Sequence, residues 1–181
     1  MKNEIRKEYK LIRKNIANKE EKDYIIFTKL INNPKILSSN TILTYVSTSD
    51  EVDTIKLIKY FLETKKVAVP KVQGYTMNFY YINSLDDLEI GNYNILEPTT
   101  QNIVTNFNNT ISITPGICFS KDLYRIGYGK GYYDRFYQKH DIYRIGICYQ
   151  KCLLNNIPHN QYDVKVNEII TEEKGSLSNN G

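Results

Sequence analysis

Residues 41–72, TILTYVSTSDEVDTIKLIKYFLETKKVAVPKV, decide the fold. The runs Thr41 to Ser47 and Lys66 to Val72 are rich in β-branched residues and predict two strands. Apolar residues between them recur at helical spacing and predict a helix of about ten residues: Ile55, Ile58, Phe61 and Leu62. Strand, helix and strand in succession predict parallel pairing through a right-handed crossover.

The rest of the chain extends this pattern. Further strands are predicted at Asn78 to Ile82, Thr110 to Thr114 and Tyr143 to Tyr149, and further helices at 3–16, from a cap at Asn18 to a break at Asn32-Asn33-Pro34, and at Gly131 to His140. We therefore expect an α/β fold, a three-layer sandwich with a mostly parallel central sheet and helices on both faces. A length of 181 residues suits one domain, expected at 1–174, followed by a disordered tail at 175–181.

One segment, Arg125-Ile126-Gly127-Tyr128-Gly129-Lys130-Gly131-Tyr132-Tyr133-Asp134-Arg135, predicts a phosphate site. Alternating glycines let the backbone curl closely around an anion, Lys130 adds a cation, and a helix beginning near Gly131 adds N–H donors. Asp134 in the first turn would be placed to hold a divalent metal. The spacing matches neither a Walker A loop nor a dinucleotide-fold fingerprint, and a plain structural turn is the alternative.

The net charge of +4 comes from the N-terminus, since residues 1–30 hold nine Lys and Arg against five Asp and Glu. In the first helix Lys2, Arg6 and Arg13 fall within about 40° of one another, beside the apolar stripe. This basic edge is placed to lean into a pocket. Nucleic acid, an anionic small ligand and a solvated helix face all remain open as its partner.

Three cysteines, Cys118, Cys148 and Cys152, form no Cys-x-x-Cys pair, and with two histidines they make no convincing zinc set. We expect reduced, structural thiols rather than a nucleophile. The sequence has no apolar run of about 18 residues, and its charged N-terminus is unlike a signal peptide, so we expect a cytoplasmic protein.

Taken whole, the string Arg-x-Gly-x-Gly-x-Gly-Tyr-Tyr-Asp resembles the signature of the 5-formyltetrahydrofolate cyclo-ligases, also called 5,10-methenyltetrahydrofolate synthetases. Other blocks of that family recur in order over about residues 2–173: Lys2-x-x-Ile5-Arg6, Glu51-Val52-Asp53-Thr54, Val69-Pro70-Lys71, Gly91 to Pro98, Pro115-Gly116-x-x-Phe119, and Pro158 to Val166 with Asp163. Three positions depart from the family pattern. Lys71 replaces an arginine, while Ser120 and Leu123 replace the Asp and Gly common in the turn before Arg125.

This resemblance implies ATP- and Mg²⁺-dependent cyclisation of 5-formyltetrahydrofolate to 5,10-methenyltetrahydrofolate, with release of ADP and phosphate. By similarity the ATP site comprises Lys2, Asn3, Glu4, Ile5, Arg6, Arg125, Ile126, Gly127, Tyr128, Gly129, Lys130, Gly131, Tyr132 and Tyr133. The folate would contact Val46, Glu51, Tyr128, Gly129, Lys130, Gly131 and Tyr132. Lys130, Arg6 and Tyr132 would act at the transferred phosphoryl group, and Asp134 and Asp163 would hold Mg²⁺.

The resemblance also implies that ATP and 5-formyltetrahydrofolate are the partners, and we expect a monomer that binds no nucleic acid and no membrane. Two alternatives remain. An RNA-binding module is one, because Lys130 to Tyr137 has a passing likeness to a sheet motif of RNA-recognition domains and the chain holds sixteen tyrosines. A relative with the same fold that uses ATP on another small acid is the other.

Overall fold

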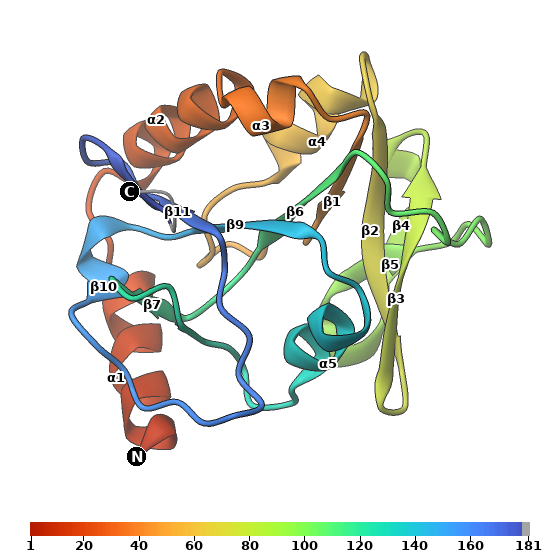
Figure 1. The fold of residues 1–181 in the computed structure, drawn as a ribbon. Helices are drawn as coiled ribbons and strands as arrows, with labels where there is room; N and C mark the ends of the chain where they lie inside the picture. The colour runs from red at the N-terminus through yellow and green to blue at the C-terminus, as the bar shows by residue number, and fades with distance from the viewer. Residues whose placement is uncertain (179–181) are drawn as a thin grey trace.

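A seven-stranded, mostly parallel sheet forms the centre of the molecule in the computed structural model, which describes residues 1–178 (Figure 1). Its strand order is β12-β11-β9-β6-β1-β2-β3. The strands are β1 (Thr41–Thr44), β2 (Lys66–Gln73), β3 (Thr76–Ile82), β6 (Thr110–Thr114), β9 (Tyr143–Ile147), β11 (Glu168–Ile170) and β12 (Ser176–Ser178). Only the outer pairs β2·β3 and β11·β12 are antiparallel. The expected mostly parallel sheet is confirmed.

Helices cover both faces of this sheet. They are α1 (Lys2–Lys14), α2 (Lys19–Ile31), α3 (Pro34–Leu37), α4 (Ile55–Leu62) and α5 (Tyr132–Lys139). Figure 1 shows α2, α3 and α4 on one face and α1 and α5 on the other. Every residue of β1 and β6 is buried, as expected for strands covered on both sides. The three-layer sandwich predicted from the sequence is therefore correct.

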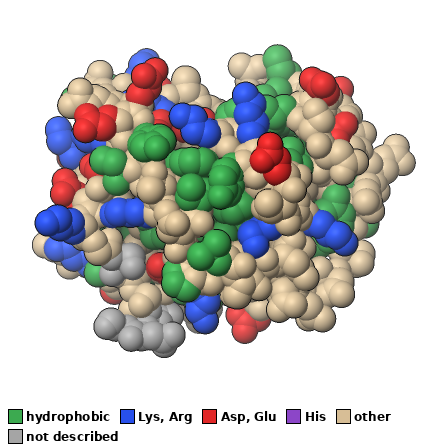
Figure 2. All heavy atoms as spheres, turned by 90° about the horizontal axis from the view of Figure 1, so that it is seen from above, with side chains coloured by type: hydrophobic (Ala, Val, Ile, Leu, Met, Phe, Trp, Pro, Cys, Tyr) green, Lys and Arg blue, Asp and Glu red, His purple; other side chains and the backbone are tan. Residues whose placement is uncertain are grey.

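The face formed by α2, α3 and α4 is the one seen in Figure 2, where hydrophobic side chains gather among charged ones. Tyr24, Leu37 and Tyr60 are exposed there, and Phe27 packs edge-on against Tyr60. Beneath them α2 and α4 contribute Ile26, Leu30 and Phe61 to the largest apolar core.

Two small sheets complete the fold. One has the order β10-β7-β8 and the other pairs β4 with β5. Their strands are β4 (Leu88–Ile90), β5 (Leu96–Pro98), β7 (Cys118–Ser120), β8 (Arg125–Ile126) and β10 (Leu153–Leu154), and short 3-10 turns lie at η1 (Leu85–Asp87), η2 (Asn92–Asn94) and η3 (Gln150–Cys152). The β7–β8 hairpin leads directly into the glycine segment, and the β4–β5 hairpin lies across from it on the β2 side.

Several element boundaries differ from the predicted ones. The first strand ends at Thr44 because the next residues bond to the segment before α4: Thr54 Oγ1 donates to the carbonyl of Tyr45 at 2.7 Å and accepts from the amide of Ser47 at 3.0 Å. Asn18 precedes α2 in a left-handed conformation and makes no side-chain cap. Ser176–Ser178 pair with β11, where a disordered tail was expected. The rest of that expected tail, 179–181, lies outside the described residues.

The β7–β8 turn tolerates the departures from the family pattern. Leu123 has φ +77°, the left-handed region in which glycine is favoured, and its side chain is 95% buried. Ser120 is fully buried and donates its hydroxyl to the carboxylate of Asp122. Burial of the Leu123 side chain offsets the backbone cost, so the hairpin is kept.

Candidate functional site

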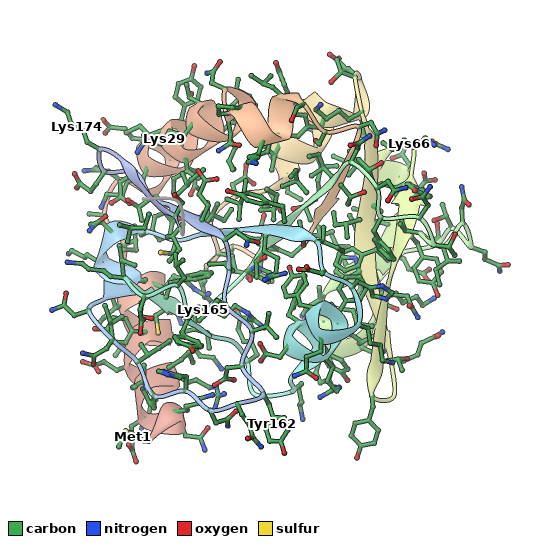
Figure 3. The ribbon with its side chains drawn as sticks, in the orientation of Figure 1. Met1, Lys29, Lys66, Tyr162, Lys165 and Lys174 are labelled. Carbon is green, nitrogen blue, oxygen red and sulfur yellow. The ribbon has the colours of Figure 1, made fainter. Side chains whose placement is uncertain are left out.

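A cavity of about 850 Å³ opens beside the carboxyl ends of β1 and β2. Its walls come from α1, the segment after β1, β2, the β4–β5 hairpin, the glycine segment, the start of α5, and residues 160–163. Figure 3 shows Tyr162, one of the lining residues, at the same end of the molecule as Met1. Segments far apart in the sequence thus meet at one site.

Most of the predicted site residues line this cavity: Lys2, Arg6, Val46, Glu51, Arg125, Ile126, Gly127, Tyr128, Gly129, Lys130, Gly131, Tyr132, Tyr133, Asp134 and Asp163. Asn3, Glu4 and Ile5 do not line it. The helical period explains this, because Lys2 and Arg6 share one face of α1 while the residues between them turn away. Ile5 packs against the apolar cluster beneath α1, and Glu4 is exposed and faces the N-terminal amine.

The glycine segment has the open backbone that the sequence predicted. Gly129 and Gly131 have φ +95° and +72°, which side chains other than glycine rarely adopt. Gly131 is the N-cap of α5, so the free N–H groups of the first turn face the cavity. Arg6 Nε donates to the carbonyl of Gly127 at 2.8 Å, which ties α1 to this segment.

Lys130 is the exposed cation of the loop. Its Nζ lies 5.9 Å from the centre of the Tyr93 ring. Within residues 1–178 this ammonium has no hydrogen bond and no carboxylate partner. An unpaired lysine at a helix N-terminus is suited to an anionic ligand.

Tyr132 begins α5 at the rim of the cavity. Its hydroxyl donates to the carbonyl of Gly74 at 2.8 Å, and a hydrogen bond with Tyr93 raises its pKa. Arg135 donates to the carbonyls of Tyr75 and Lys130. These contacts connect the β2–β3 turn to the glycine segment.

Asp134 and Asp163 are the candidate metal ligands. Asp134 Oδ1 accepts from the amide of Val164 at 3.1 Å. This bond ties the start of α5 to the segment that carries Asp163. Asp163 Oδ2 accepts from Lys2 Nζ at 2.8 Å and from the amide of Asn160 at 2.9 Å. In both cases the protein's own donors engage one carboxylate oxygen, and within residues 1–178 the second has no hydrogen-bond donor.

The two carboxylates, Asp134 and Asp163, fit Mg²⁺. The ion takes oxygen ligands and commonly keeps several waters, binding through one or two carboxylates together with substrate phosphates. A cage of three or more protein ligands is absent among residues 1–178, and Mg²⁺ at a phosphate site does not require one.

Three buried polar groups of residues that line the cavity lack hydrogen-bond partners in the described part of the chain. They are Arg13 Nε, Arg125 Nε and the hydroxyl of Tyr133. The Arg125 side chain is 94% buried and its guanidinium lies 5.2 Å from the centre of the Tyr133 ring. Arg125 Nη1 donates to Pro115 O, and Nη2 is 3.9 Å from Asp134. Since buried polar groups are normally satisfied by protein, water or ligand, these groups are suited to a polar ligand.

Glu51 lies on the opposite wall. Its Oε1 accepts from the amide and the hydroxyl of Thr48, at 2.9 and 3.1 Å, and its Oε2 accepts from the Tyr128 hydroxyl at 3.0 Å. Arg13 Nη2 donates to the same hydroxyl at 2.7 Å. Burial and the Glu51 carboxylate raise the pKa of Tyr128, so the phenol stays protonated.

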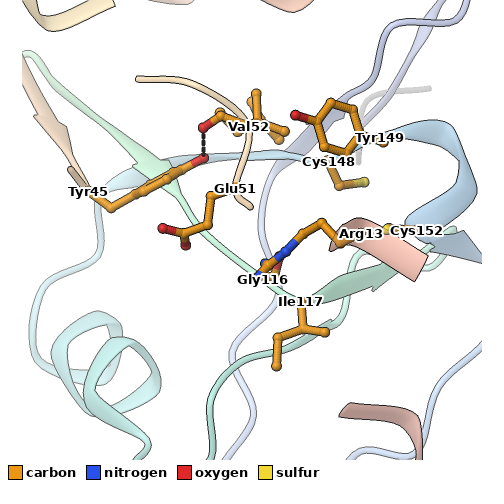
Figure 4. A pocket seen from close by; sticks show the side chains of 10 residues that line it. Arg13, Tyr45, Glu51, Val52, Gly116, Ile117, Cys148, Tyr149 and Cys152 are labelled. Carbon is orange, nitrogen blue, oxygen red and sulfur yellow. Dashed lines mark hydrogen bonds between the residues drawn. The ribbon is translucent and has the colours of Figure 1, made fainter. Parts of the chain in front are cut away.

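Arg13 also borders a second, small cavity of about 10 Å³, drawn in Figure 4 with Glu51, Cys148 and Cys152 beside it. Its volume matches about one water molecule. Burial raises the pKa of Cys118 to about 12 and that of Cys152 to about 11, so both are thiols at neutral pH. The expectation of structural cysteines agrees with this chemistry.

The sequence grouped Arg13 with Lys2 and Arg6 on one helix edge, and all three line the large cavity. The contact of Arg13 with Tyr128 was not predicted. Nor was the β4–β5 wall, which contributes Tyr93, Ile95, Leu96 and Glu97. The sequence feature that belongs to this hairpin is the glycine at position 91, six residues before Glu97. A Cβ on Gly91 would lie 1.9 Å from Glu97 Cδ, so only glycine leaves room for the glutamate side chain.

No helix within residues 1–178 is long and apolar enough to cross a bilayer. A mostly parallel α/β sheet, with a lysine-bearing glycine loop and a buried carboxylate lining one cavity, is typical of a small-molecule enzyme of the α/β class. The chain belongs to the 5-formyltetrahydrofolate cyclo-ligase family, whose model matches residues 1–172.

Named relatives agree with this assignment. A probable 5-formyltetrahydrofolate cyclo-ligase from Caenorhabditis elegans is 29% identical over 191 residues, which cover 95% of this chain and 93% of that protein. The 5-formyltetrahydrofolate cyclo-ligase of Haemophilus influenzae is 26% identical over 92% of this chain and 95% of its own.

Solved structures show the same fold. The 5,10-methenyltetrahydrofolate synthetase of Aquifex aeolicus superposes with a TM-score of 0.87 at 28% identity, covering 98% of this chain and 92% of that one. The Mycoplasma pneumoniae synthetase, at 24% identity and a TM-score of 0.76, supports the fold alone. The protein is therefore an enzyme of this family.

Proposed function

We propose that the protein converts 5-formyltetrahydrofolate to 5,10-methenyltetrahydrofolate with ATP and Mg²⁺, releasing ADP and phosphate. One observation carries the proposal: the glycine loop with its unpaired Lys130 faces the buried Glu51 across a single cavity. A volume of about 850 Å³ lies within the range of pockets that hold a cofactor or substrate.

The nucleotide would lie on the α1 and α5 side. Lys2, Arg6 and Lys130 supply positive charge there, and the amides at the start of α5 supply donors. Arg125 Nε and the Tyr133 hydroxyl, which need acceptors, would meet phosphate oxygens or the formyl group. Asp134 and Asp163 would hold Mg²⁺, which would supply positive charge to offset that of the phosphate groups.

The folate would lie on the Glu51 side. The pterin ring carries N–H groups that match a buried carboxylate, and hydrogen bonds to a charged acceptor are stronger than neutral ones. Val46 is 96% buried and ends this wall beside β1. Pro70, Val72 and Met77 add apolar surface on which a flat ring can lie.

The chemistry has two steps. The formyl oxygen attacks the γ-phosphorus of ATP, an O–P bond forms, and the bond to the ADP oxygen breaks. N10 then attacks the formyl carbon and loses its proton, while the C–O bond breaks and phosphate leaves. Phosphoryl transfer asks the protein mainly to position the reactants and spread charge, and Lys130 and Arg6 are the side chains suited to this. Tyr132 stands beside them at the rim.

Absorbance of the conjugated methenyl product, followed with purified protein, tests the proposal. We expect product only when 5-formyltetrahydrofolate, ATP and Mg²⁺ are all present. Turnover that persists in excess chelator would contradict the metal assignment, and no turnover with any nucleotide would contradict the reaction.

RNA binding is not favoured by the fold. The stretch that resembled a sheet motif of RNA-recognition domains, Lys130 to Tyr137, forms a loop and helix α5 instead of a strand. Phe136 and Tyr137 are buried in the core and are not free to stack on bases. The other alternative, that the protein uses ATP on another small acid, is tested by the same assay with other substrates. The cytoplasmic location stays a prediction.

A further inference from the structure

The hydroxyl of Tyr128 is the meeting point of three segments that are distant in sequence. It accepts from Arg13 on α1 at 2.7 Å and donates to Glu51 after β1 at 3.0 Å, while its own backbone lies in the glycine loop. Arg13 and Glu51 are each 92% buried. Tyr128 as a residue is 46% exposed and lines the cavity, while its hydroxyl is held between Arg13 and Glu51.

A count of acceptor sites shows where a ligand can meet Glu51. A carboxylate offers about four lone-pair sites. Thr48 fills the two on Oε1, and Tyr128 fills one on Oε2. One site remains, on Oε2. A ligand N–H that takes this site shares Oε2 with the Tyr128 hydroxyl, so the ligand and the glycine loop contact the same carboxylate oxygen.

Tyr128 is also part of the opposite wall. It stands between Gly127, whose carbonyl is held by Arg6, and Gly129, whose φ is +95°. A shift of its hydroxyl therefore moves the backbone amides that face the anion side of the cavity. Arg13 orients the phenol from the side of α1. Its own position is set by a hydrogen bond from Nη1 to the carbonyl of Gly116 at 3.3 Å.

We propose that Arg13 and Tyr128 are positioning residues that link Glu51 to the glycine loop, so that a ligand on Glu51 and a ligand on the loop change each other's affinity. The inference rests on the proposed function, because the two ligands it names are the folate and the nucleotide. The coupling is reciprocal by thermodynamic necessity.

Calorimetric titration measures it directly. The dissociation constant of 5-formyltetrahydrofolate is determined with and without a saturating non-hydrolysable ATP analogue and Mg²⁺, and the ratio of the two constants is the coupling factor. We expect a factor at least about threefold away from one in the native protein, and within about 1.5-fold of one in Tyr128→Phe.

Two controls make the test specific. Tyr162→Phe removes a phenol from the rim of the same cavity, and no described residue hydrogen-bonds to that hydroxyl, so the native factor should persist. Arg13→Lys keeps a donor for Tyr128 and should preserve most of the coupling, whereas Arg13→Met, which has no donor, should lose it. Thermal melts of each variant report whether the fold is retained.

The outcomes separate the two proposals. Failure of the native protein to bind either ligand would refute the proposed function. Binding of both ligands with a native factor of one, or a native factor retained in Tyr128→Phe, would refute the coupling and leave the proposed function standing.

Discussion

Replacing Lys130 with methionine separates catalysis from stability. The side chain is exposed, and its described contact is the Tyr93 ring at 5.9 Å. Loss of an exposed cation–π contact costs about 0.5–1 kcal/mol, which lowers the melting temperature of a chain of this size by roughly 1–4 °C. If Lys130 meets the transferring phosphoryl group, kcat should fall by about 100-fold, equivalent to about 2.7 kcal/mol in the barrier.

Lys66 provides a matched control. It is an exposed lysine whose Nζ lies 5.7 Å from the Tyr81 ring, at the far side of the molecule from Met1 (Figure 3). Lys66→Met should lose a similar amount of stability and keep native kcat. Initial rates against ATP should show a larger loss in kcat than rise in KM for Lys130→Met, because charge interactions that strengthen in the transition state appear in kcat. Near-native kcat in Lys130→Met would mean that the glycine loop is a structural turn.

Three further changes test other parts of the site and fold. Glu51→Gln should raise the folate dissociation constant about tenfold and spare ATP binding, because a hydrogen bond to a charged partner is lost; equal loss of ATP affinity in calorimetry would contradict this. Asp134→Asn should shift the Mg²⁺ dependence of the initial rate to higher concentration, and Lys130→Met should not. Burial and Lys139 lower the pKa of His140, so the unfolded chain takes up the proton first and stability should fall as pH drops from about 6.5 towards the folded pKa. Thermal melts of His140→Asn should lack this loss; an unchanged pH profile would refute it.

Periodicity predicted most of the main elements of the fold, but it missed strand β11 and the short helix α3. The helix at Ile55–Leu62 and the strand at Thr110–Thr114 are long enough for an apolar pattern to repeat, and both are found with the expected type. Strands of two or three residues such as Arg125–Ile126 hold no such repeat, so the hairpins beside the cavity were missed. The pairing of Ser176–Ser178 was missed for another reason: it depends on the partner strand β11, which local sequence does not reveal.

The features of the site also divide into those that local sequence predicts and those that it does not. Glycines with positive φ and the cationic face of α1 are local properties, and the sequence indicated both. The bond between Arg13 and Tyr128 joins residues 115 positions apart, and the one between Tyr128 and Glu51 joins residues 77 apart. Neither follows from spacing within an element. Long-range polar contacts of this kind depend on how α1, β1 and the loop meet in the folded chain.

The charges of the cavity explain why a ligand is needed to complete it. Lys2 is paired with Asp163, and Glu51 is reached by the buried Arg13 through a phenol. These pairs leave four groups without hydrogen-bond partners among the described residues: the Lys130 ammonium, the Nε atoms of Arg13 and Arg125, and the Tyr133 hydroxyl. Three of the four belong to cationic side chains, and all four residues line the same cavity as the amides of α5. The unsatisfied groups on the described walls therefore favour an anion with several acceptor oxygens, and a triphosphate satisfies more of them at once than a single carboxylate does.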